Sequence, residues 1–386
     1  MEKFQITFLP DNVTIEAESG ESLLDVANRG KIHINASCGG EGVCGRCVVE
    51  LRDGTVKANP GLYLDDQDFS KGIRLACRAA VDGPATIFIP LDSRADASFF
   101  KTAHQAEEAL TVENPDPMVK QHHLTLEPPS AADNQSDLDR VAAALAELGL
   151  QDADIDLSAL KTMPTVLRES DFKVTASVFH ELPIQNPESQ PWSRIVSFKP
   201  LADGDKFYGL ALDVGTTSVW LRLINLVTGE VMPSVGDLNG QISFGEDVIS
   251  RIVYASRKDG LKRLQTSVID TINRLLERYE DAYPGFRDKT YIIVASGNTT
   301  MAHLLLGVEP KNIRLAPYVP PVSSWPSVRA SFLGINVAPH TVMKVYPSVS
   351  SYVGGDIVSG VLASGLFKKP ELTLFIDVGT NGEIVI

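Results

Sequence analysis

The stretch ASCGGEGVCGRCVVEL, residues 36–51, holds three of the four cysteines of the chain. The full set, Cys38, Cys44, Cys47 and Cys77, has gaps of five, two and 29 residues. Three ligands in one tight loop and one distant ligand are typical of a 2Fe–2S cluster. Structural zinc, the alternative, usually takes two CxxC-like pairs, and only the second and third cysteines form such a pair. The spacing therefore predicts that the four thiolates are cluster ligands.

The same loop is rich in glycine, with Gly39, Gly40, Gly42 and Gly45 among its residues. A loop that wraps a cluster must turn sharply and direct backbone N–H groups at sulfur, and these hydrogen bonds tune the reduction potential. Glycine permits the positive φ angles that such turns require. We therefore expect left-handed backbone conformations in this loop.

The residues around the loop alternate in the way that predicts a small β-rich domain. Strands are expected at 4–10, 13–17, 47–51 and 85–90, with a helix at 22–30. In this order of elements and in its cysteine spacing, the segment 1–90 resembles a β-grasp ferredoxin. The five-residue first gap is similar to that of the adrenodoxin and putidaredoxin branch, whereas plant-type ferredoxins have a gap of four.

Composition and charge narrow the possible partners. The chain has 386 residues, 44% hydrophobic and 22% charged, with 49 acidic and 35 basic residues and a formal net charge of -14. This acidity argues against nucleic acid as the main ligand, because phosphate binding needs clustered Lys and Arg. There is no apolar run of about 18 residues that would span a membrane, and no signal-peptide pattern at the start. Few cysteines in such a chain predict a reducing compartment, the cytoplasm.

The segment that follows predicts a connection and then a small domain. Residues 91–135 are rich in Pro, Asp and Asn and are expected to be a linker, with a short helix within 94–110. A small α/β domain is expected at 136–205, with a helix that Ser136 caps. A second helix falls within 157–170, and its start lies either before or after Pro164.

Two near-copies of one motif dominate the rest of the chain: LALDVGTTS at 210–218 and LFIDVGTNG at 374–382. In each copy an apolar strand ends at an Asp, and a Gly and a Thr follow. The glycine lets the backbone approach a phosphate closely, and the turn presents N–H and hydroxyl groups to its oxygens. The carboxylates of Asp213 and Asp377 are suited to hold hydrated Mg²⁺. The phosphate-binding residues are predicted to be Gly215, Thr216, Thr217, Gly379, Thr380 and Asn381.

These two copies resemble the phosphate motifs of the acetate kinase, sugar kinase, heat-shock chaperone and actin superfamily, which has two ribonuclease H-like lobes. The resemblance implies a first lobe at 206–370 and the start of a second at 371–386. Asp356 either lies near the cleft or caps the helix that begins beside it. His303 either faces the cleft or is a core or surface histidine.

The combination of a ferredoxin module with this ATPase type resembles the reductive activators of corrinoid-dependent enzymes. The matching motifs lie at 38–47, 210–218, 296–307 and 374–384. The resemblance implies ATP-dependent activation of a corrinoid protein, in which one electron passes from the 2Fe–2S cluster to Co(II) and regenerates Co(I). It implies ATP with Mg²⁺ as cofactor, a low-potential electron donor, and the corrinoid protein of a methyltransferase or O-demethylase system as partner.

In overall class, we expect an α/β and α+β multidomain chain whose second lobe is incomplete at Ile386. The family runs well past this point, so weak ATP binding by the chain alone is expected. Two other functions remain open. One is an electron-carrier or sensory iron–sulfur module whose lobe does not catalyse, and the other is a small-molecule kinase with an accessory cluster.

Overall fold

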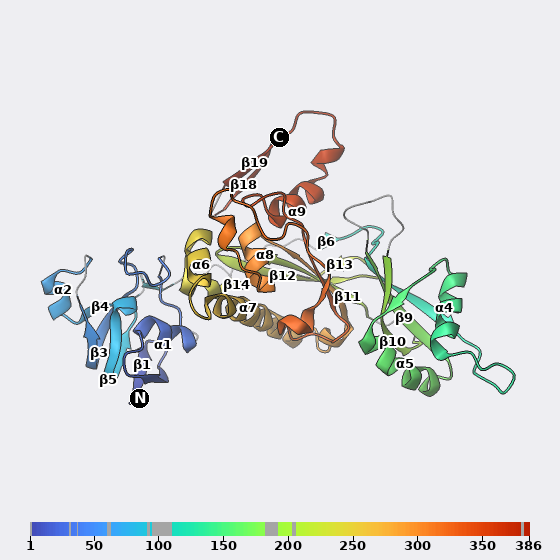
Figure 1. Cartoon of the computed structure of the whole chain (residues 1–386), viewed down its shortest axis with the longest axis horizontal. Helices are drawn as coiled ribbons and strands as arrows, with labels where there is room; N and C mark the ends of the chain where they lie inside the picture. The colour runs from blue at the N-terminus through green and yellow to red at the C-terminus, as the bar shows by residue number, and fades with distance from the viewer. Residues whose placement is uncertain are drawn as a thin grey trace.

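The computed structural model describes residues 2–30, 32–36, 38–59, 63–90, 93–94, 110–181, 192–202, 206–379 and 382–386. These residues form sheets of five, four, eight and two strands. Figure 1 shows the eight-stranded sheet and its helices in the middle, with the N-terminal domain on one side and the four-stranded sheet on the other. No helix in the described part of the chain is long and apolar enough to cross a membrane.

The N-terminal domain is a mixed five-stranded sheet with one helix packed on it. Alternation along the first strand places Ile6 and Phe8 in a core with Leu23 and Val26 of the helix. Ser22 caps this helix as an N-cap, and the strands and helix predicted for the domain are confirmed. The strand order is β2-β1-β5-β3-β4. The elements are β1 (Lys3–Leu9), β2 (Val13–Glu18), α1 (Leu23–Arg29), β3 (Val48–Ala58), α2 (Asp66–Ser70), β4 (Ile73–Leu75) and β5 (Ala79–Phe88).

The second domain begins earlier than the sequence pattern predicted. Residues 91–135 were expected to be a linker, but Val119–Thr125 form strand β7 in the four-stranded sheet. The strand was missed because only Val119 and Leu124 are apolar and buried at well-separated positions of this polar segment. The short helix expected within 94–110 falls at 95–109, outside the described residues. The sheet order is β7-β9-β10-β8, with β8 (Asp154–Ile155), β9 (Lys173–Glu181) and β10 (Trp192–Pro200).

Two helices cover this sheet, α4 (Asp137–Glu147) and α5 (Leu157–Glu169). As predicted, Ser136 is the N-cap of α4, and its side-chain oxygen accepts from the Asp139 backbone N–H. Helix α5 starts before Pro164 and runs through it, so the later of the two possible starts is wrong.

The eight-stranded sheet has the order β16-β17-β15-β11-β12-β13-β6, and β14 pairs with β12 outside this path. Strands β11 and β12 are antiparallel, whereas β15 and β17 run parallel to β11. The strands are β6 (Leu110–Thr111), β11 (Tyr208–Val214), β12 (Ser218–Asn225), β13 (Glu230–Val231), β14 (Val235–Leu238), β15 (Thr290–Ser296), β16 (Val328–Arg329) and β17 (Val342–Val345). The helices of this domain are α6 (Val248–Ala255), α7 (Gly260–Ala282), α8 (Thr299–Leu306) and α9 (Gly355–Ser364), with a 3-10 turn η4 (Gly240–Phe244).

The second and third domains share a hydrophobic core. Phe179 and Val196 of the four-stranded sheet pack in one cluster with Phe207, Tyr291 and Val342 of the eight-stranded domain. By contrast, the buried cores of the N-terminal domain and of the eight-stranded domain have no member in common. The second and third domains are therefore expected to behave as one body.

After α9 the chain forms a separate hairpin of β18 (Phe375–Val378) and β19 (Gly382–Val385). Its apolar side chains are largely solvent-exposed, with exposed fractions of 55% for Ile376, 85% for Val378 and 67% for Ile384. Figure 1 shows this hairpin beside α9, away from the N-terminal domain.

Candidate cluster site and phosphate-binding hairpins

The cysteine loop has the backbone that its glycines predicted. Gly39, Gly40, Gly42 and Gly45 have φ angles of 62°, 89°, 74° and 72°. These left-handed conformations fold the loop into a series of tight turns. Three of the cysteines therefore lie on one short, strongly curved segment, and Cys77 comes from the 3-10 turn between β4 and β5.

The four thiols form two pairs. The sulfurs of Cys47 and Cys77 are 3.3 Å apart, and the thiols of Cys38 and Cys44 lie close enough to influence each other's pKa. Within the part of the chain that the structure describes, no three His, Cys, Asp or Glu side chains converge to hold a metal ion. Two pairs of thiolates are what a binuclear cluster needs, because each iron takes two of the four cysteines. The donor set therefore fits a 2Fe–2S cluster better than a single zinc ion.

Backbone amides point at the sulfurs. Burial raises the pKa of the Cys38 thiol, but hydrogen bonds from the backbone N–H groups of Val43, Gly42 and Gly40 outweigh it, so the pKa is lowered. The Cys77 thiol and nearby backbone groups lower the pKa of Cys47 to about 7, against the effect of burial. At these two cysteines the thiolate form, which is the form that binds iron, is favoured, whereas burial raises the pKa of Cys44 and the Cys47 thiol raises that of Cys77.

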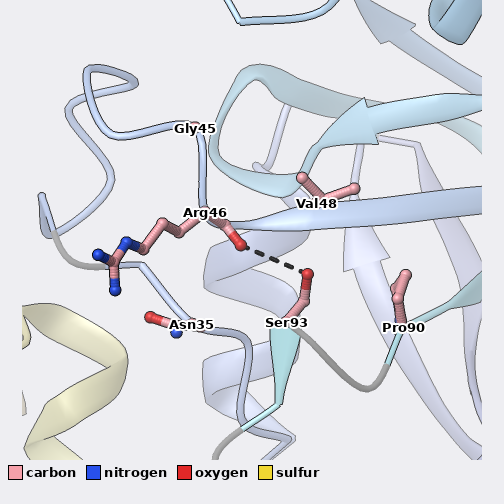
Figure 2. Close-up of a pocket in the computed structure, with 6 residues that line it drawn as sticks. All are labelled: Asn35, Gly45, Arg46, Val48, Pro90 and Ser93. Atoms are coloured by element: carbon pink, nitrogen blue, oxygen red, sulfur yellow. Dashed lines mark hydrogen bonds between the residues drawn. The ribbon is translucent and has the colours of Figure 1, made fainter.

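A depression of about 430 Å³ lies on one flank of the loop. Figure 2 shows its lining and the hydrogen bond that the Ser93 hydroxyl donates to the Arg46 carbonyl oxygen, at 3.4 Å. Gly45 and Arg46 separate two of the cysteines in sequence, so the backbone between Cys44 and Cys47 borders this depression. The lining residues are Asn35, Gly45, Arg46, Val48, Pro90 and Ser93.

The first phosphate hairpin joins β11 to β12 in a tight turn. The Gly215 N–H donates to the Ser218 carbonyl oxygen at 2.9 Å. A Cβ atom at Gly215 would lie only 2.8 Å from that same oxygen, so the turn requires glycine. Asn298, at the start of α8, donates to the Thr216 hydroxyl at 3.0 Å, and Asn239 donates to the Gly215 carbonyl at 2.8 Å. The hairpin is therefore held from two sides.

A fully buried arginine that the sequence reasoning missed also holds this hairpin. Arg251 of α6 donates to the carbonyl oxygens of Thr216 at 2.5 Å and Gly245 at 2.8 Å, and to the Gln241 side chain at 3.2 Å. Burial lowers the pKa of its guanidinium to about 9. The sequence did contain a signal for this role, because a charged residue on the otherwise apolar face of α6 needs several hydrogen-bond partners when it is buried.

Asp213 and Asp377, the aspartates of the two copies, lie close enough for their charges to interact. The Asp213 side chain is accessible to solvent, but the protein atoms around its carboxyl group partly desolvate it and, together with the charges of Asp356 and Asp377, raise its pKa to about 6. Burial and Asp377 also raise the pKa of Asp356. The N-cap of α9 is Gly354, so Asp356 belongs to the first helical turn and does not cap the helix. Glu383 of β19 was missed by the sequence reasoning. Its pKa is raised by partial burial and by the charges of Asp356 and Asp377.

The remaining predicted positions are placed as follows. The Thr217 carbonyl accepts from the Asn239 N–H at 2.9 Å, which extends the support of the first hairpin. Gly379 follows β18, whereas Thr380 and Asn381 lie outside the described residues. His303 is in the core, since it is fully buried and its Nδ1 donates to the Thr299 carbonyl at 2.7 Å, so the cleft alternative is wrong.

Comparisons with known proteins agree with this arrangement. Residues 6–82 match the 2Fe-2S iron-sulfur cluster binding domain, residues 111–197 the RACo linker region, and residues 208–369 the RACo middle region. The chain is similar to the corrinoid activation enzyme RamQ of Eubacterium limosum, with 27% identity over 95% of this chain and 56% of the relative. It is also similar to a solved reductive activator for corrinoid,iron-sulfur protein, with 34% identity, a TM-score of 0.64, and coverage of 99% of this chain and 61% of the other.

By fold and site, the chain is a multidomain α/β protein with an N-terminal 2Fe–2S domain. The two RACo regions together match more than half of it, and the chain belongs to the family of reductive activators of corrinoid-dependent enzymes. It spans less than two thirds of the length of these two relatives.

Proposed function

We propose that the chain carries out ATP-dependent reductive activation of a corrinoid protein, in which one electron passes from a 2Fe–2S cluster to Co(II) and regenerates Co(I). The observation that carries the proposal is the presence of two sites in one chain: paired thiols at the cysteine loop, and a hairpin whose carboxylates interact with one another. A small-molecule kinase has no need of a one-electron centre. The names of the two relatives support a corrinoid protein as the substrate.

In this function the cysteine loop holds the electron carrier. The ligands are Cys38, Cys44, Cys47 and Cys77, and the bound cluster supplies a centre that accepts and releases one electron. The backbone N–H groups directed at Cys38 stabilise negative charge on its sulfur. Because free thiols are needed to load the cluster, a reducing compartment such as the cytoplasm suits the protein. A low-potential donor is required to reduce it.

The eight-stranded domain holds the nucleotide. The order β17-β15-β11-β12-β13, with β12 antiparallel to a parallel set, is that of a ribonuclease H-like lobe and supports the assignment of 206–370 to the first lobe of the ATPase superfamily. Asp213 and Asp377 lie close enough for their charges to interact, and their carboxylates would hold the hydrated Mg²⁺ that accompanies the nucleotide. The phosphate-binding residues are Gly215, Thr216, Thr217, Gly379, Thr380 and Asn381.

The nucleotide is needed because electrons must flow uphill. The Co(II)/Co(I) couple of corrinoids lies far below an ordinary 2Fe–2S potential, so the complex that contains Co(I) must be favoured by another source of free energy. Nucleotide provides it only if the chain binds nucleotide with different affinity in the two states of the complex. The corrinoid protein of a methyltransferase or O-demethylase system is the proposed partner.

The proposal is tested by following Co(I) absorption after the reduced chain is mixed with a Co(II) corrinoid protein, with and without millimolar Mg-ATP. We expect Co(I) to form only with nucleotide. Cluster oxidation without any effect of nucleotide would support an electron carrier with a non-catalytic lobe instead. Phosphorylation of a small molecule with no cobalt reduction would support a kinase.

A further inference from the structure

One face of the cysteine loop contacts the eight-stranded domain. Figure 1 shows the N-terminal domain beside α6 and α7. Arg257, just after α6, donates to the Gly39 carbonyl oxygen at 3.0 Å and forms an ion pair with Glu41. The contacts therefore reach the segment that carries three of the proposed cluster ligands.

Three further contacts between described residues belong to this interface. Arg46, between two of the cysteines, pairs with Glu246 at 3.4 Å. Arg263 of α7 lies 3.6 Å from Asp25 of α1. Asn28 of α1 donates to the Ser243 carbonyl oxygen at 3.4 Å. We name the residues on the side of the eight-stranded domain, Ser243, Glu246, Arg257 and Arg263, the α6 edge.

The fit also depends on shape. The backbone carbonyl of Phe244 approaches Gly39 so closely that a Cβ atom at this glycine would lie 2.5 Å from the oxygen. Only glycine permits this approach, in addition to the positive φ that the loop needs there. The α6 edge therefore matches the loop in both charge and contour.

Exposed ion pairs contribute to the interface between the ferredoxin domain and the eight-stranded domain, whereas the second and third domains share a hydrophobic core. The ion pairs of this interface are exposed, since the Arg257 and Glu41 side chains are 37% and 51% accessible. Pairs of this kind contribute about 0–1 kcal/mol each and weaken with salt. No hydrophobic core cluster of the described residues spans the two domains, whereas one does join the second domain to the third.

We infer that the α6 edge is a docking surface for the cysteine loop of the chain's own ferredoxin domain, and that this docking is electrostatic and reversible. In the docked state Gly39 is buried, while Glu41 and Arg46 remain partly exposed and are held in ion pairs with the α6 edge. A redox partner that contacts these residues therefore excludes the α6 edge, and the ferredoxin domain must leave this surface before such a partner binds. The inference depends on neither nucleotide nor corrinoid binding.

The test measures the distance between the two domains in the full chain. Nitroxides attached through non-natural amino acids at Lys57 of β3 and Glu277 of α7, both exposed, leave every cysteine untouched. Pulsed dipolar spectroscopy is run on the oxidised protein at about 20 mM and about 1 M salt, because these concentrations bracket weak and strong screening. We expect one narrow distance peak at low salt and loss of that peak at high salt.

Charge-reversal variants identify the contacts responsible. Arg257→Glu and Glu41→Arg should each lose the narrow peak at low salt, and the double variant should regain most of it because the ion pair is restored with reversed sign. Lys262→Glu, an exposed residue on α7 whose substitution changes the net charge equally, should keep the peak. Circular dichroism and the visible spectrum confirm folding of each variant. A broad distribution in the wild type at low salt, or a peak unaffected by salt and by both single reversals, would overturn the inference.

Discussion

The ionised Asp213 carboxylate lowers the stability of the folded chain at neutral pH, although the proposed function requires it. Its pKa in the folded chain is about 6, above the ordinary value of 3.8, so the folded state binds its proton more tightly than the unfolded state does. Stability from this group is therefore full below about pH 4 and is lost as pH rises through about 6.

Asp213→Asn should therefore stabilise the eight-stranded domain at pH 7, raising its unfolding temperature, and the gain should vanish near pH 4. The same change should abolish the response to Mg-ATP, because the carboxylate is lost. Thermal unfolding at the two pH values and calorimetric titration with nucleotide measure both effects. Asp281→Asn, at an exposed position on α7, is the matched control. A destabilised variant at pH 7 would show that Asp213 is paired with a cation rather than held among carboxylates.

Substitution of Cys77 tests whether the cluster can be lost while the rest of the chain stays folded. Cys77→Ser should lose the 2Fe–2S absorption and the rhombic paramagnetic signal that the reduced wild type is expected to give, while the eight-stranded domain keeps its unfolding temperature. The reason is that the thiol packs against the hydrophobic core of the N-terminal domain, and among the described residues this core is separate from that of the eight-stranded domain. Iron and sulfide analysis should give about two of each per wild-type chain. Ala80→Ser, three residues further, controls for the added hydroxyl, and zinc without iron in the wild type contradicts the assignment.

At the scale of elements, η4 and α6 connect the two proposed sites. Arg251 of α6 holds the Thr216 carbonyl of the phosphate hairpin, and the same guanidinium holds Gly245 next to the α6 edge. Arg251→Met leaves these buried carbonyl oxygens without a donor, which costs about 1–3 kcal/mol for each group. We expect the variant to lower the unfolding free energy of the eight-stranded domain by about 3 kcal/mol, and to weaken nucleotide binding.

Denaturant titration of Arg251→Met, with Lys262→Met as the exposed-cation control, measures this effect. An unfolding free energy within about 0.5 kcal/mol of the wild type, the range of ordinary surface substitutions, would show that the guanidinium does not support the hairpin.

The elements that the sequence predicted are those with a strong local signal. By contrast, the sequence patterns of strand β7 and of the 3-10 turn at Cys77 are weak. Strand β7 forms because it pairs with β9. The pairing of thiols, the carboxylate group around Asp356 and the contacts of Arg251 join residues far apart in the chain. A single sequence does not encode such contacts in any local period, so they became visible only in three dimensions.

At the scale of the whole molecule, the second and third domains form one body to which the ferredoxin domain is docked. Buried ion pairs reinforce their shared core: Lys344 with Glu181, and Arg329 with Asp156. Glu181→Ala leaves the largely buried Lys344 ammonium without its carboxylate partner and with only the Trp325 carbonyl oxygen, at 3.4 Å, to accept from it, and we expect a loss of about 3 kcal/mol. Differential scanning calorimetry should show one shared transition for the two domains that moves to lower temperature in the variant. The transition of the ferredoxin domain should stay in place, and separate transitions for the second and third domains would contradict the single body.

Electron transfer to cobalt is the central claim for the whole molecule, and freeze-quench electron paramagnetic resonance tests it most directly. The reduced 2Fe–2S cluster and the Co(II) corrinoid are both paramagnetic, so one spectrum reports on both. After the reduced chain is mixed with a Co(II) corrinoid protein and millimolar Mg-ATP, the two signals should fall together in equal amounts. Without nucleotide, or with Asp213→Asn, both should persist. Loss of the cobalt signal while the cluster signal remains, or an equal rate without nucleotide, would contradict the account.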